Sequence, residues 1–132
     1  MHMLDVVSAG IRSHFNLNRK EQTSRIISTM DNPNVDIISH PTSRTILQQQ
    51  QQYVYDIDIG EIIHIAKDTN TILEINASPN RLDLSEEHIR IAVENDDNCK
   101  LLINSDAHSI SDMHLLKFGL AQARRDGLNL II

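Results

Sequence analysis

The feature that most constrains the fold of this chain is a fourfold alternation of apolar strand patterns with helical patterns. Strands are expected at residues 4–11, 35–39, 71–76 and 100–105, and a helical pattern follows each of them. Strands that alternate with helices form parallel sheets with right-handed crossovers. The sequence therefore predicts an α/β fold with four consecutive βα units and parallel strands.

The helical patterns carry signals for their ends and for their buried faces. Asn18 and Glu21 have the spacing of a capping box, which opens a helix that runs to about residue 30. Ser85 is expected to cap the third helix, and Ser111 the fourth, which Gly127 would close. In a helix near residues 57–68, apolar residues at i, i+3, i+4 and i+7 predict one buried face: Ile59, Ile62, Ile63 and Ala66.

The length of 132 residues is that of a single domain spanning residues 1–132. Four parallel units cannot close a barrel, which takes about eight strands. The chain is therefore expected to be either a small open sheet or a part of a larger barrel. Its first strand would then be an exposed apolar edge, so the isolated chain is expected to self-associate.

Charge and cysteine content narrow the class of protein. A net charge of -6 argues against a surface that wraps duplex nucleic acid, although bound dications would reverse the local charge at a phosphate site. Cys99 is the only cysteine, so no internal disulfide can form. No signal peptide or membrane-length apolar stretch is visible. These features predict a soluble cytoplasmic domain with no membrane partner.

Candidate metal ligands stand directly after two of the expected strands. His40 follows the second strand, and Asp106 and His108 follow the fourth with i, i+2 spacing. Sites in parallel α/β folds lie at the carboxyl ends of the strands. A carboxylate with imidazoles suits Zn, Mn or Fe. The alternatives are an Asp106 that caps the following turn, a surface His108, and a neutral His40 bonded to a carbonyl group.

Other polar residues are placed to support such a site. Glu74 lies within an apolar strand, where a buried carboxylate needs partners, so it is expected to orient a metal ligand rather than to bind the metal itself. Arg44 and Arg81 lie a few residues beyond their strands, where they would meet a phosphate. Solvated loop arginines are the ordinary alternative. The sequence has no Gly-rich phosphate loop and no Gly-x-Ser-x-Gly elbow, so nucleotide binding by such a loop and serine hydrolysis are not expected.

Three stretches together resemble one known family. They are Asp36–Arg44, Leu73–Asp83 and Ile103–Ser109. They are similar to the PHP (polymerase and histidinol phosphatase) domain, and most of all to the PHP domain at the C-terminus of bacterial and archaeal family X DNA polymerases. The resemblance runs from about residue 5 to residue 127. It implies a distorted (β/α)7 barrel, of which this chain would be the C-terminal four βα units.

The resemblance also implies a chemistry. The family holds up to three Mn, Zn or Fe ions, and in family X polymerases it is associated with 3′–5′ exonuclease and related phosphoesterase activity. By motif, His40 matches the His-Pro metal ligand, while Asp106 and His108 match the last Asp-x-His pair as metal ligands and catalytic residues. Asn76 matches a position that lines the substrate site. Bridging metals would lower the pKa of a bound water to about 7.

Two departures from the family pattern bear on activity. The family begins with a His-x-His motif and further ligands, and none of these is present. The position where the family usually has a His ligand after its strand is here Arg12, which cannot bind a metal because it keeps its proton. His14, two residues on, would substitute as a metal ligand if the strand continues. Otherwise His14 is a loop residue and the ligand is lost.

Three functions follow from these features. The first is an active exonuclease domain that acts on DNA ends, with the N-terminal half of the barrel supplied by a longer polypeptide. The second is a phosphatase of the histidinol-phosphate kind, which acts on a small phosphate ester. The third is a truncated or degenerate PHP module without catalysis, for which Arg12 and the absent first half of the family pattern are the evidence.

Overall fold

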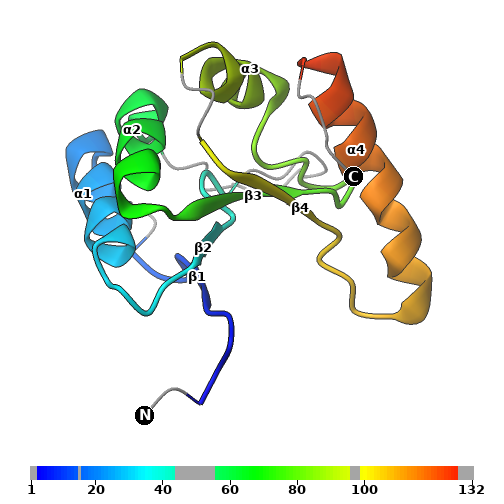
Figure 1. Ribbon diagram of the computed structural model, residues 1–132, viewed down its shortest axis with the longest axis horizontal. Coiled ribbons are helices and arrows are strands. Elements are labelled where there is room, and N and C mark those ends of the chain that lie inside the picture. Colours follow the sequence, from blue (N-terminus) through cyan, green and yellow to red (C-terminus); the bar gives the residue numbers. More distant parts are fainter. Residues whose placement is uncertain (1–2, 15, 44–55, 96–98, 128–132) are drawn as a thin grey trace.

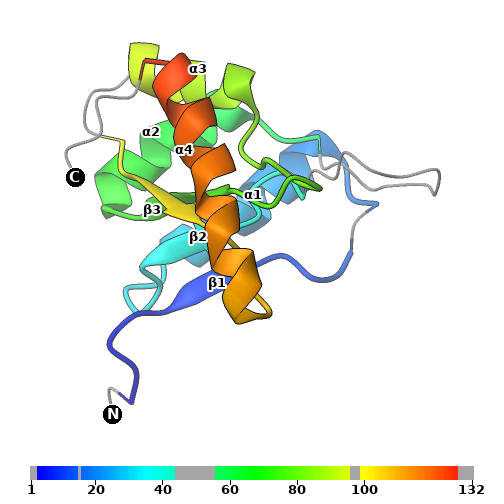
Figure 2. The same cartoon turned by 90° about the vertical axis from the view of Figure 1, so that its right-hand side faces the viewer.

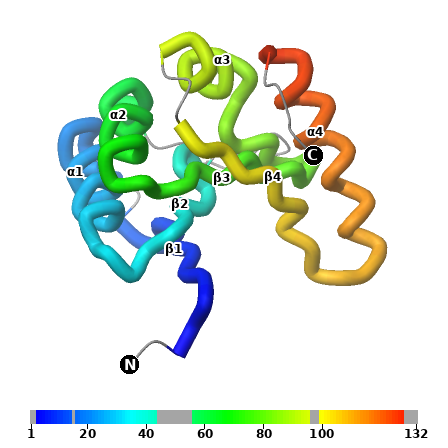
Figure 3. The backbone as a smooth tube through the Cα atoms, in the orientation of Figure 1, coloured from blue at the N-terminus to red at the C-terminus, as the bar shows by residue number. Residues whose placement is uncertain are grey.

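The computed structural model describes residues 3–14, 16–43, 56–95 and 99–127, which form one parallel sheet flanked by helices. The four strands lie side by side in chain order, as the backbone trace in Figure 3 shows. The strands are β1 (Ser8–Gly10), β2 (Ile37–Ser39), β3 (Ile72–Asn76) and β4 (Leu101–Asn104). The helices are α1 (Arg19–Met30), α2 (Ile59–Thr69), α3 (Glu86–Asn95), the 3-10 helix η1 (Ile110–Leu115) and α4 (Leu116–Arg125). The predicted α/β fold with four parallel βα units is confirmed.

The helices α1 to α4 lie along one face of the sheet, and none of them covers the opposite face (Figure 1). Turned by 90°, the molecule shows α4 running across the β4 side of the sheet (Figure 2). The core lies between these helices and the sheet. Its largest fully buried apolar side chains come from α1, α2, β3, the segment before α3, and α3 itself: Ile26, Ile62, Leu73, Ile75, Leu84 and Ile89.

Most of the helix signals in the sequence act as expected. Asn18 Oδ1 accepts a hydrogen bond from the Glu21 N–H at 2.9 Å, and Glu21 Oε2 accepts from the Asn18 N–H at 3.2 Å, which completes the capping box. Ser85 Oγ accepts from the His88 N–H at the start of α3. The four apolar residues of the α2 stripe are all buried. The capping box and the α2 face are therefore confirmed.

The structure corrects two boundaries. Residues 4–7 lie outside β1, and Leu4 and Val6 are exposed, because pairing with the neighbouring strand begins only at Val7, whose carbonyl accepts from the N–H groups of Asp36 and Ile37. The expected strand over residues 4–11 is therefore too long.

The expected cap at Ser111 is also wrong. Ser111 lies inside η1, and its hydroxyl group pairs with that of Ser109 at 2.8 Å. The α-helical turns begin only at Leu116, so a 3-10 segment takes the place of a capped first turn. Gly127 has φ +87° directly after the last residues of α4, which confirms it as the helix stop.

Arg44 lies outside the described residues, so its expected role stays a prediction. Among the described residues, no helix has the length and apolar character needed to cross a membrane.

Candidate functional site

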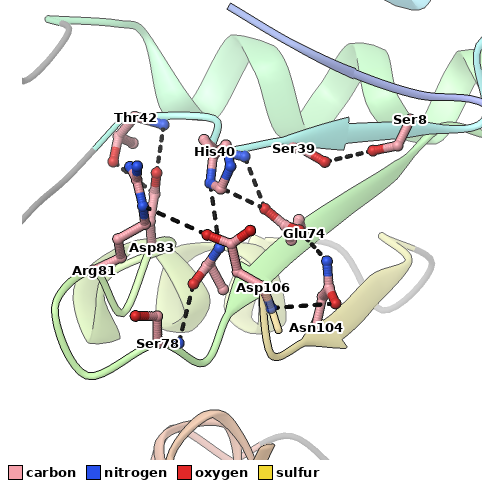
Figure 4. A network of polar contacts seen from close by, with 11 residues as sticks. Ser8, Ser39, His40, Thr42, Glu74, Ser78, Arg81, Asp83, Asn104 and Asp106 are labelled. Atoms are coloured by element: carbon pink, nitrogen blue, oxygen red, sulfur yellow. Dashed lines mark hydrogen bonds and ion pairs between the residues drawn. The ribbon is translucent and has the colours of Figure 1, made fainter. Parts of the chain in front are cut away.

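Polar side chains from three successive strand ends gather at one end of the sheet (Figure 4). His40 follows β2, Glu74 and Asn76 belong to β3, and Arg81 and Asp106 lie on the segments after β3 and β4. The strands are parallel and in register, with Asn76 opposite Asn104, so their carboxyl ends meet at the same edge. The fold therefore brings most of the expected site residues together.

His40 is held by two buried neighbours on β3. Its N–H donates to Glu74 Oε2 at 2.9 Å, and its ring Nδ1 lies 3.4 Å from the same oxygen. The same Nδ1 lies 3.3 Å from the amide nitrogen of Asn76. His40 is only 9% exposed. Its ring is therefore fixed in place from the side of β3.

The Glu74 carboxylate is buried, with 2% of the residue exposed, and both of its oxygens have donors. Oε2 accepts from His40 as described, and Oε1 accepts from the Asn104 side-chain amide at 2.7 Å. A buried carboxylate is tolerated when such bonds satisfy it. Glu74 thus links the segment after β2 to β4 and contacts His40 directly, which is the geometry of a residue that orients another.

The segment after β4 presents Asp106 and His108 in different ways. Asp106 Oδ2 lies 3.8 Å from Arg81 Nε, with both side chains about 30% exposed. His108 is exposed, and its Nδ1 lies 2.7 Å from the main-chain oxygen of Asp106. The His108 N–H donates to Asp112 Oδ2 at 3.0 Å, and this bond is the main reason why the pKa of Asp112 is lowered.

The segment between β1 and α1 contains Arg12, which stands where a His ligand was expected, and His14, its possible substitute. Arg12 lines a cavity of about 250 Å³ that His40 also lines. His14 is exposed, and its Nδ1 contacts Ser13 Oγ at 3.1 Å, while its carbonyl accepts from Gln22 Nε2 at 2.7 Å. β1 ends at Gly10, so the strand does not continue to His14, which is a loop residue with contacts to its own segment and to α1.

Sequence reasoning missed Asp83, which is fully buried beside this site. Asp83 Oδ1 accepts from the Thr42 hydroxyl group at 2.6 Å, and Oδ2 accepts from the Thr42 N–H at 3.2 Å. The Asp83 carbonyl also accepts from the Asn76 N–H. Local sequence patterns could not have identified Asp83, because its hydrogen-bond partner Thr42 lies 41 residues away in the chain.

Two residues of the site have unusual backbone conformations. His40 has φ +50° and Asp106 has φ +53°, in the left-handed region that residues with a Cβ atom seldom adopt. His14, the third candidate ligand with this conformation, has φ +53°.

The donor types fit a transition metal, but the described residues do not by themselves form a metal centre. Within residues 3–14, 16–43, 56–95 and 99–127, no three His, Cys, Asp or Glu side chains lie together as a metal site would require. A bound zinc ion takes at least three protein ligands. Any complete centre that includes His40 and Asp106 therefore needs further donors.

Comparison with known proteins adds a relationship that the geometry alone does not give. No family model matches the chain. The chain is 42% identical over 122 residues, 92% of its length, to the DNA polymerase/3′-5′ exonuclease PolX of Bacillus subtilis. The chain is homologous to one region of that protein. It is also 39% identical over 59 residues, 45% of its length, to a probable phosphatase of Clostridium novyi.

Both alignments cover a limited part of the relative. The chain spans about a fifth of the Bacillus subtilis PolX, and the second match covers about a fifth of the Clostridium novyi protein. The relationship with PolX extends over nearly all of this chain, whereas the match to the phosphatase covers less than half of it. The region shared with PolX therefore includes the whole candidate site.

Proposed function

We propose that this chain is the C-terminal part of a PHP domain, four of its seven βα units, and that the complete domain is a metal-dependent phosphoesterase acting on the 3′ ends of DNA. The observation that carries the proposal is the convergence of His40, Arg81 and Asp106 at one end of a parallel sheet. The similarity to a protein named as a polymerase and 3′-5′ exonuclease supports it. The face of the sheet that α1 to α4 leave uncovered is compatible with a part of a barrel.

Each residue has a role in this proposal. His40, Asp106 and His108 hold the metal ions together with donors from the part of the barrel that this chain lacks, and Asp106 and His108 are the catalytic pair. Arg81 steadies the phosphate from its place 3.8 Å from Asp106. Glu74 orients His40, and its contacts with the His40 N–H and ring support this role.

The remaining residues complete the proposed site. Asn76 lines it, and Arg44 is a second phosphate contact. The domain spans the whole chain and works in the cytoplasm, where the lone Cys99 stays reduced.

A second candidate is a phosphatase that acts on a small phosphate ester. The match to the probable phosphatase favours it. A nucleic-acid end and a small ester present the same phosphate group to Arg81, so the two candidates differ in what lies beyond that phosphate. They are separated by the substrate that is hydrolysed.

The proposal is tested by placing the chain in the context of a complete relative. In a chimera, this chain replaces the matching region of the Bacillus subtilis PolX, and release of nucleotides from 3′-labelled duplex DNA is measured with Mn²⁺. We expect activity in the chimera and its loss in His40→Ala and Asp106→Ala. His64→Ala, the same change on the exposed surface of α2, is the control and should leave activity unchanged.

A further version of the chimera carries Arg12→His. Activity only in this version would show that the natural chain is a degenerate module and would overturn the proposal. Hydrolysis of a small phosphate ester without release of nucleotides would favour the phosphatase. In parallel, the isolated chain and its His40→Ala and Asp106→Ala variants are titrated with Mn²⁺ by calorimetry. Loss of binding in both variants would show that His40 and Asp106 share one site.

A further inference from the structure

The hydrogen-bond partners of His40 and of His108 favour the ring proton on different nitrogen atoms. Nδ1 of His108 lies 2.7 Å from the Asp106 main-chain oxygen, and a carbonyl oxygen only accepts hydrogen bonds. Nδ1 of His108 therefore carries the proton, and Nε2 keeps a lone pair. Nδ1 of His40 instead faces the Asn76 amide nitrogen at 3.3 Å, and an amide NH₂ group only donates.

The orientation of the Asn76 amide is fixed by a neighbouring backbone group. The Ser78 N–H donates to Asn76 Oδ1 at 3.0 Å, so the oxygen of the amide is turned toward Ser78 and the nitrogen toward His40. The Asn76–His40 hydrogen bond then requires an Nδ1 without a proton. In the neutral ring the proton must consequently lie on Nε2.

Glu74 has the opposite effect from Asn76 on Nδ1 of His40. Its Oε2 lies 3.4 Å from Nδ1 of His40, and a carboxylate only accepts, so Glu74 favours a proton on Nδ1. The carboxylate is held in this position by the His40 N–H and the Asn104 amide. Asn76 is fully buried and Glu74 nearly so, and both have a polar side-chain atom within 3.4 Å of Nδ1.

We propose that Asn76 is a positioning residue that holds the proton of neutral His40 on Nε2, and that Glu74 stabilises the alternative tautomer. A cation binds an imidazole nitrogen that has a lone pair. A cation held at Nε2 would leave the ring proton on Nδ1, where Glu74 rather than Asn76 would be its hydrogen-bond partner. The part concerning cations rests on the proposed function, whereas the tautomer itself does not.

The test reads the two ring nitrogens of His40 directly. The ¹⁵N-labelled chain is examined by NMR without metal at a pH of about 8.5, well above the ordinary histidine pKa of about 6.5. We expect His40 to carry its proton on Nε2 and His108 to carry its proton on Nδ1. His114, exposed in η1, serves as the internal reference for a solvent-facing ring.

Two variants then move the proton by design. Asn76→Asp keeps an acceptor for the Ser78 N–H and turns an acceptor instead of a donor toward His40, so the proton should move to Nδ1. Asn76→Leu removes the donor without adding charge and should have the same effect. Asn80→Asp, on an exposed residue of the same loop, is the matched control and should leave His40 unchanged.

The outcomes separate a positioning role from a structural one. If Asn76 only stabilises the fold, its variants lower the free energy of unfolding without moving the proton, and the proposal fails. A parent chain with its His40 proton on Nδ1 also overturns it, whether or not the variants fold. The measurement needs neither metal nor substrate, so a failed nuclease test would leave it intact.

Discussion

Thr42 and Asp83 are joined by two hydrogen bonds although 41 residues separate them in the chain. The Thr42 hydroxyl group donates to one carboxylate oxygen and the Thr42 N–H to the other. Thr42 lies two residues after His40, and Asp83 lies two residues after Arg81. This pair therefore connects the segment with a candidate metal ligand to the segment with a candidate phosphate contact.

We expect Asp83→Ala to lower the free energy of unfolding by about 1–3 kcal/mol, because it leaves the buried hydroxyl and N–H groups of Thr42 without this acceptor. Urea unfolding of Asp83→Ala, Thr42→Val and the double variant measures the coupling, expected at about 0.5–3 kcal/mol. Asp5→Ala, at an exposed position, controls for the loss of a carboxylate. Strictly additive effects would show that the two residues act independently.

Gly119 allows α4 to approach the sheet closely. A Cβ atom at this position would lie 2.7 Å from both Ala77 Cβ and Ile103 Cγ2, so Gly119→Ala forces the helix away. We expect a loss of about 1–3 kcal/mol in the free energy of unfolding. Gly60→Ala on α2 is the control, since its nearest contact would be 3.5 Å away, at Asp58 Oδ1. That change should be neutral or stabilising, and a neutral Gly119→Ala would contradict the close packing.

Acid unfolding should depend on Asp58, which caps α2. The hydrogen bond from the Glu61 N–H lowers the pKa of the Asp58 carboxyl group, and Arg19 adds to this effect. A lowered pKa in the folded state means that the stabilisation is complete above the unfolded-state pKa of about 3.9 and is lost as the pH falls through the folded-state value.

The measurement for Asp58 is the urea midpoint of the parent and of Asp58→Asn between about pH 5 and pH 2. The difference between the two proteins should shrink as the pH falls, because only the parent loses a charge at this cap. Asp5→Asn, at an exposed position, is the control. A difference that stays constant over the whole range would contradict the role of the charge.

The isolated chain should self-associate in solution. β1 and β4 are the outer strands of the sheet, so each has one edge without a neighbouring strand among the described residues. Leu102 of β4 is 40% exposed. Light scattering should show dimers or larger species, and Leu102→Lys should shift them toward monomer. A monodisperse monomer of the parent chain would contradict this expectation.

Much of the fold could be predicted because its signals are local. The capping box of Asn18 and Glu21 and the apolar stripe of α2 involve residues within one or two turns of each other, and both were correct. The limits of β1 were not, because the length of an edge strand depends on its partner, and pairing with β2 begins only at Val7. The Ser111 cap failed since a 3-10 segment precedes α4.

The candidate site was predictable only in outline. His40 and Asp106 both follow strands, which predicts that they lie at one end of a parallel sheet. The structure places both residues there. Their neighbours come from elsewhere in the chain: Glu74 lies 34 residues from His40, and the Asn104 amide that holds Glu74 lies 30 residues further on. Such contacts depend on strand register, which local sequence patterns do not contain.

The left-handed backbone at His40 has a consequence for stability. A residue with a Cβ atom pays about 1–2 kcal/mol in that conformation, and glycine does not. His40→Gly should therefore unfold at a higher urea concentration than His40→Ala, although both remove the imidazole. Selection for stability alone would favour glycine at this turn. The histidine that stands there lowers stability, which fits the metal-binding role that we propose for it.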